Sequence, residues 1–140
     1  MNYLSRICLA AACALLAGNA AAIDTSQPLL CAAIEVNECI DGYGCSEVLA
    51  EEVGAPTFIR IDLDKKQIRI TKDGPVTKIE HLDEVEGRII MQGVEVGRNP
   101  DVVDGTGWTI SIEQDTGRLV VTAVTQQAAV IAFGACTERL

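Results

Sequence analysis

A single histidine, His81, is the first residue to consider for catalytic chemistry. It lies in the segment Ile79-Glu80-His81-Leu82-Asp83, so a histidine general base could pair with a neighbouring carboxylate. The sequence has no second histidine to build a His-rich metal site. It also lacks the Gly-x-Ser-x-Gly elbow of serine hydrolases. We therefore expect a solvated turn histidine and a protein that is not an enzyme.

Two pairs of aspartates could do acid–base chemistry or bind Ca²⁺. Asp62 and Asp64 lie two residues apart, on one face of a predicted strand. Asp64 also opens a predicted hairpin turn, a position that aspartate favours. Asp101 and Asp104 lie in an oxygen-rich loop that lacks EF-hand spacing. We expect turn and loop roles for all four, with no metal and no cofactor.

Phe58, Arg60 and Asp62 alternate along a predicted strand and therefore share one of its faces. An exposed aromatic side chain beside two charged ones is a possible binding surface. The alternative is that the segment before the strand covers Phe58. The sequence leaves both interpretations open.

The first 22 residues have the pattern of a secretory signal peptide. Arg6 supplies a positive charge, residues 7–18 form an apolar run, and three alanines at 20–22 match a small-residue cleavage site. The run is shorter than the roughly 20 apolar residues that span a bilayer. We predict cleavage after Ala22 and no stable membrane association afterwards. Residues 23–140 are then one periplasmic or secreted domain.

Four cysteines remain in that domain after the two in the signal peptide are removed. An even number in an exported chain indicates two disulfides. Cys39 and Cys45 bracket a turn-forming segment with two glycines and can meet locally, which leaves Cys31 to pair with Cys136. Zinc sites and redox motifs use closer cysteine spacings. We predict the structural disulfides Cys31–Cys136 and Cys39–Cys45.

The exported domain is strongly acidic. It holds all 20 acidic residues and all but one of the 11 basic residues of the chain, which gives a formal net charge of −10. Such a surface repels nucleic acid and anionic membranes. It permits a cationic partner, and acidity also serves solubility alone.

Short apolar runs separated by turn residues predict a mainly β fold. Strands are expected over residues 57–63, 67–72, 76–82, 88–96, 107–113, 118–125 and 130–135. Residues 28–36 fit either a strand or a helix, and one short helix is expected from Ser46 to Val53, stopped by Gly54. The prediction is an antiparallel meander of seven to eight strands that forms a small barrel or a sandwich.

The last two predicted strands, 118–125 and 130–135, are largely apolar on both faces. One face belongs to the core, and the other needs a cover. The helix from Ser46 is the favoured cover, ahead of a partner subunit or a ligand.

Several stretches resemble an uncharacterised family of short exported, periplasmic proteobacterial proteins. They are Leu30-Cys31-Ala32, Glu38-Cys39 with Cys45, residues 56–62, Gly107-Trp108-Thr109, and residues 133–137. The resemblance covers nearly the whole mature chain and implies a compartment, with no activity attached. In size and cysteine use the chain is also similar to periplasmic lysozyme inhibitors of the eight-stranded barrel type. That family's loop motif has no match here, so no inhibitory residue carries over.

These observations together predict a non-enzymatic binding domain. A cationic protein is the partner that best suits its charge. A small apolar ligand held inside a barrel is one alternative, and an enzyme that uses His81 or a carboxylate pair is another. The oligomeric state is not predicted.

Overall fold

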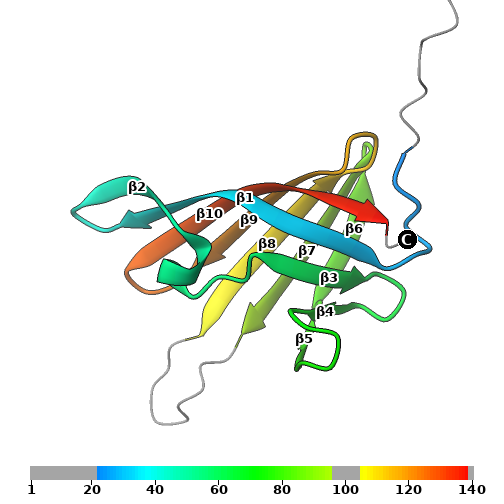
Figure 1. Ribbon diagram of the computed structural model, residues 1–140, viewed down its shortest axis with the longest axis horizontal. Helices are drawn as coiled ribbons and strands as arrows, with labels where there is room; N and C mark the ends of the chain where they lie inside the picture. Colours follow the sequence, from blue (N-terminus) through cyan, green and yellow to red (C-terminus); the bar gives the residue numbers. More distant parts are fainter. Residues whose placement is uncertain (1–21, 96–104, 139–140) are drawn as a thin grey trace, which may run out of the picture.

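The structure is a computed structural model that describes residues 22–95 and 105–138. It contains one antiparallel sheet of ten strands (Figure 1). The strands are β1 (Leu29–Ile40), β2 (Gly44–Val48), β3 (Phe58–Asp62), β4 (Gln67–Arg69), β5 (Val76–Lys78), β6 (His81–Val85), β7 (Arg88–Glu95), β8 (Thr106–Glu113), β9 (Arg118–Val124) and β10 (Ala128–Glu138). A short 3-10 helix, η2 (Ala50–Val53), follows β2. The mainly β prediction is confirmed, and the prediction of seven to eight strands is wrong.

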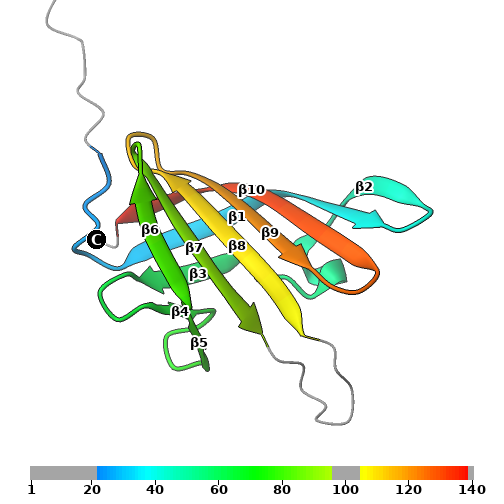
Figure 2. The same ribbon diagram turned by 180° about the vertical axis from the view of Figure 1, so that it is seen from behind.

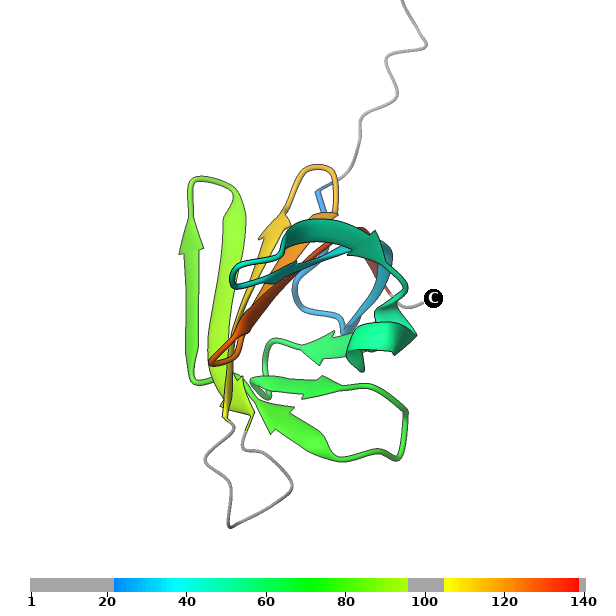
Figure 3. The ribbon, with the colours of Figure 1, turned by 90° about the vertical axis from the view of Figure 1, so that its left-hand side faces the viewer.

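The sheet curls into a barrel-like half-cylinder, seen from one end in Figure 3. Its strand order is β5-β4-β3-β1-β10-β9-β8-β7-β6, and β2 pairs with the far half of β1. The first and last strands pair directly, from Leu29 opposite Glu138 to Ile40 opposite Ala128. Figure 2 shows the strands from β10 to β6 from behind. This strand order therefore ends in β5 and β6, which are consecutive in the chain.

Residues 79 and 80 cross from one edge of the sheet to the other. The Ile79 N–H donates a hydrogen bond to the Lys66 carbonyl, and the Glu80 N–H donates one to the Gln92 carbonyl, both at 2.9 Å. The Ile79 side chain is 1% exposed and belongs to the core. The single strand predicted over 76–82 is therefore two strands, because the chain changes partner strand in the middle of this apolar run.

The concave side of the sheet encloses the hydrophobic core. Its largest fully buried apolar side chains come from β1, from strands on both sides of β1 and from the crossing: Leu29, Ile61, Ile79, Ile89, Met91 and Ile112. Trp108 and Val121 pack against this cluster. Small barrels of about eight strands are filled by their own side chains, and the inward residues here do the same.

The segment after residue 36 differs most from the sequence prediction. Residues 29–36 are strand, and β1 continues to Ile40, into the turn-forming segment between Cys39 and Cys45. Gly42 and Gly44 adopt positive φ angles of 78° and 87°, which lets the chain reverse and form β2. The first three residues of the helix predicted from Ser46 to Val53 are therefore strand. What remains is η2, which ends as expected at Gly54 in a left-handed conformation with φ 67°.

Both predicted disulfides are present. Cys31 and Cys136 lie opposite each other on β1 and β10, and Cys39 and Cys45 lie opposite each other on β1 and β2. Two structural disulfides indicate an oxidising compartment. Among the described residues, no helix is long and apolar enough to cross a membrane. The predicted signal peptide lies, except for its last residue, outside the described residues.

Candidate functional site

His81 opens the edge strand β6, with an exposed side chain and Gln92 as its cross-strand neighbour. In the part of the chain that the structure describes, no hydrogen bond or ion pair joins His81 to a carboxylate. No group of three or more His, Cys, Asp or Glu side chains in that part could hold a metal ion.

Asp62 and Asp64 do not form a carboxylate pair. Asp62 ends β3 and accepts a hydrogen bond from the Lys65 backbone N–H at 3.0 Å and another from the Lys65 ammonium. This is an aspartate that holds a turn, and Asp64 is exposed within the same turn. The hydrogen bond from the Lys65 side chain is the main cause that lowers the pKa of Asp62, burial acts in the opposite direction, and the hydrogen bond from the Lys65 backbone lowers the pKa further. Asp101 and Asp104 lie outside the described residues.

We expect the Asp62→Asn variant to lose stability at neutral pH and to lose less in acid. Because its pKa is lowered in the folded state, the Asp62 carboxylate stabilises the fold at pH values above the ordinary aspartate pKa. This contribution disappears as the pH falls through the pKa of Asp62 in the folded protein. The ion pair is at the surface, so the difference at pH 7 should be below about 1 kcal/mol. Urea unfolding at pH 7 and pH 2.5 measures it. The control is Asp64→Asn, and an equal pH response in both variants would contradict the role of Asp62.

Phe58, Arg60 and Asp62 lie together on the outer face of β3, because Ile61 between them is buried in the core. Phe58 is 55% exposed, so the segment before β3 does not cover it. Arg60 is half-buried and lies directly opposite Arg69 on β4. The possible binding surface thus exists as a continuous face. Its chemistry is more basic than the sequence pattern of β3 alone suggested.

A second outward surface lies on β2, β1, β10 and β9, and we call it the arm face. It consists of Glu47 from β2, Glu35 and Asn37 from β1, Ile131 and Phe133 from β10, and Val120, Thr122 and Val124 from β9. Val36 and Ala132, which lie between them in sequence, and Leu119, which precedes Val120, are buried. Because side chains alternate along a strand, the arm face points away from the core.

Strand register determines how charged and apolar groups meet on the arm face. Glu35 lies opposite Phe133, which lies opposite Val120. In the next row, Glu47 and Ile131 lie on either side of Asn37. Phe133 is 43% exposed and Val124 is 53% exposed. The result is an apolar centre with carboxylates along one side.

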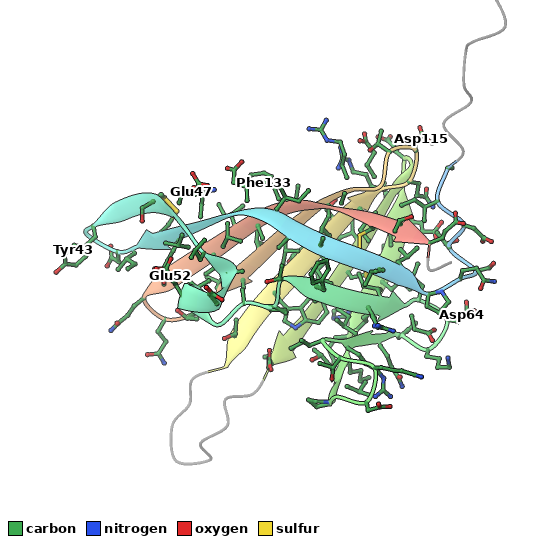
Figure 4. All side chains as sticks on the ribbon, viewed as in Figure 1. Tyr43, Glu47, Glu52, Asp64, Asp115 and Phe133 are labelled. Atoms are coloured by element: carbon green, nitrogen blue, oxygen red, sulfur yellow. A yellow bond between two sulfur atoms is a disulfide. The ribbon has the colours of Figure 1, made fainter. Side chains whose placement is uncertain are left out.

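The hairpin of β1 and β2 projects beyond the curled sheet and carries Tyr43 at its tip (Figure 4). Tyr43 is 90% exposed. The hairpin is held by the Cys39–Cys45 disulfide and by a hydrogen bond of 3.0 Å from the Tyr43 N–H to the Ile40 carbonyl. An exposed aromatic on a covalently closed turn needs little further ordering when it binds a partner.

The electrostatics of this region are one-sided. Residues 23–59 contain no lysine, arginine or histidine, whereas the hairpin and η2 carry six carboxylates: Glu35, Glu38, Asp41, Glu47, Glu51 and Glu52. None of the three ion pairs found among the described residues involves any of them. The arm face therefore lies in a strongly negative field.

The sequence did predict that the outer faces of the last two strands need a cover, but the expected cover is wrong. The helix η2 packs against β1. Glu47 and Phe133 project from one side of the sheet and Glu52, on η2, from the other (Figure 4). The helix is too short and too far round the sheet to reach Phe133, so the apolar centre of the arm face stays open.

Comparisons with models of protein families, with curated proteins and with solved structures find no match to this chain. The site must therefore be interpreted from its own geometry and charge.

Proposed function

We propose that this protein is an exported, non-catalytic binding domain whose arm face receives a cationic protein. The observation that carries the proposal is the arrangement of Phe133, Ile131 and Val124 as an apolar centre next to Glu35 and Glu47. Protein interfaces have a desolvated apolar core inside a polar rim. An exposed phenylalanine at the centre is a suitable anchor residue.

Charge selects the class of partner. The six carboxylates of the hairpin and η2 lie in a stretch with no basic residue. A cationic surface would be attracted to them before contact, which raises the association rate and makes binding sensitive to salt. A neutral or anionic partner would gain nothing from this charge, and an anionic one would be repelled.

The compartment is part of the proposal. The two disulfides favour an oxidising environment, and the predicted signal peptide supports the periplasm or the medium. The resemblance to short exported proteobacterial proteins favours the same location. Rigid, covalently closed scaffolds suit a binding role outside the cell, where proteases are abundant.

The test passes periplasmic and secreted proteins of the cell that makes this protein over the immobilised mature domain. We expect the domain to retain a basic protein at 50 mM salt and to release it at 500 mM. Phe133→Ser removes the apolar anchor, and Glu47→Lys reverses a charge beside it. Each should weaken retention at least tenfold, which corresponds to about 1.4 kcal/mol. Mass spectrometry identifies the retained protein, and titration with the purified partner gives the affinities.

The matched control is Asp115→Lys, which makes the same charge change at the far end of the sheet (Figure 4). It should change the affinity less than twofold. Equal weakening by Glu47→Lys and Asp115→Lys would show attraction to net charge alone and would contradict the arm face as the site. Retention of an acidic protein, or of no protein that distinguishes the variants, would also count against the proposal.

A further inference from the structure

The hairpin region from β3 to β5 has the opposite charge to the rest of the molecule. Residues 58–78 contain six basic side chains, Arg60, Lys65, Lys66, Arg69, Lys72 and Lys78, and three acidic ones, Asp62, Asp64 and Asp73. All four lysines of the chain are in this segment. This segment has a local charge of +3 in a domain whose net charge is −10. Solubility does not account for the basic cluster, because the acidic surface already provides it.

Four of these cations line one hollow of about 320 Å³ on the outer side of β3 and β4. Its lining consists of Arg60, Lys65, Arg69 and Lys72 together with Pro28, Ile61, Asp62 and Gln67. Pockets for small molecules begin at about this size, roughly 300 Å³. Asp62 is the one acidic residue in the lining, and its carboxylate is occupied by Lys65.

The two arginines in the hollow are held close together by the sheet. Arg60 and Arg69 are direct cross-strand neighbours on β3 and β4, and like charges directly opposite each other destabilise a sheet. The Arg69 guanidinium donates a hydrogen bond to the Gly74 carbonyl at 2.9 Å. Arg60 has no ion pair among the described residues. No ion pair among the described residues therefore offsets the repulsion between the two arginines.

The Arg60 guanidinium provides a second, independent observation. Its Nη1 atom is buried and has no hydrogen-bond partner in the described structure. A buried donor without an acceptor destabilises the fold, and does so more strongly when the donor is charged. Because Arg60 lines the basic hollow, a small movement of its side chain would bring this donor to an acceptor from outside the chain.

We propose that this hollow binds the phosphoryl group of a small phosphate monoester. Arginine presents a planar fork of donors that matches phosphate geometry, and lysine adds a point charge. The lining carries four positive charges and one negative charge, which suits a group with a charge near −2 better than a single carboxylate. A phosphoryl group accepts through three oxygens, enough for Arg60, Arg69 and one lysine at once.

A soluble ester is favoured over a lipid headgroup as the source of this phosphate. A domain with a net charge of −10 is repelled from an anionic bilayer at long range. A small soluble ester reaches the hollow without bringing the acidic remainder of the molecule close to a negative surface. The proposal does not depend on the arm face, which is a separate surface on other strands.

The test is titration of the mature protein with glycerol 3-phosphate, followed by NMR shifts of the β3 and β4 amides and by calorimetry. We expect saturable binding that glycerol and potassium chloride at equal ionic strength do not reproduce. Arg60→Gln should weaken it at least tenfold. The control Arg118→Gln removes the same charge from an exposed site on β9 and should change it less than twofold.

Lys72→Gln is a second test variant, in case Arg60→Gln does not fold. Lys72 is exposed and lines the same hollow, so its replacement should leave the fold intact. It should weaken binding at least threefold while the circular dichroism spectrum stays native. No saturable binding, or equal weakening by Arg118→Gln, would overturn the proposal. Binding to vesicles that contain phosphatidic acid, but not to glycerol 3-phosphate, would overturn the soluble source.

Discussion

Replacement of Cys31 and Cys136 together by alanine is expected to lower the free energy of unfolding by about 4–5 kcal/mol. The bond joins residues 105 positions apart, and a cross-link that closes a long loop restricts the unfolded chain strongly. Cys31 is 0% exposed and Cys136 is 8% exposed, so the variant also loses buried sulfur contacts. For a domain of this size such a loss is a large part of the total stability. Urea unfolding of the mature domain at 25 °C measures it.

The matched control is the double variant of Cys39 and Cys45 to alanine. That bond spans 6 positions, so the same entropy argument gives about 2 kcal/mol. The hairpin also lies outside the core, and its loss should leave the unfolding transition cooperative. Equal destabilisation by the two double variants would contradict loop closure as the main source of the effect.

The sequence was sufficient for most strands and for the Cys39–Cys45 disulfide because those features depend on local patterns, and the Cys31–Cys136 pairing followed by elimination. Cys39 and Cys45 flank a turn with two glycines, which indicated local pairing before any strand was placed. Period-two alternation placed Phe58, Arg60 and Asp62 on one face of β3 correctly. Side-chain direction within a single strand follows from the sequence.

The neighbours of a strand do not follow from its own pattern. The position of β1 between β3 and β10 follows from long-range pairing, and an irregularity in register between Ala33 and Glu35 decides which β1 side chains face Phe133. The opposition of Arg60 and Arg69 arises in the same way, from the pairing of β3 with β4. Both candidate surfaces therefore depend on register, and a shift of one residue would send each side chain to the other face.

Helix propensity misled the prediction of residues 46–53. Ser46 is a good helix cap and Gly54 a good stop, but the disulfide brings Cys45 opposite Cys39 on β1. The backbone of residues 44–48 then forms hydrogen bonds with β1. Tertiary pairing overrides weak local preferences, so the helix is reduced to its last four residues, Ala50–Val53.

The pairing of β1 with β10 also makes Gly134 a position where a methyl group should be strongly destabilising. We expect Gly134→Ala to lower the free energy of unfolding by about 3 kcal/mol. A Cβ atom at Gly134 would overlap the carbonyl oxygen of Ala32 and lie 3.0 Å from its carbonyl carbon and 3.2 Å from the Ala33 Cα. These are backbone atoms of β1 beside the irregularity in register, so no flexible side chain can move aside. Urea unfolding again provides the measurement.

Gly107→Ala is the control because it makes the same change in a strand where space is available. A Cβ at Gly107 would meet no atom within 4 Å. Both substitutions restrict the unfolded chain equally, which favours folding by roughly 0.4–1 kcal/mol in each variant. The difference in free energy of unfolding between the two variants therefore isolates the clash on β1. Gly107→Ala should be neutral or slightly stabilising. If both variants unfolded at the same urea concentration, the close backbone approach between β1 and β10 would be refuted, and with it the register that builds the arm face.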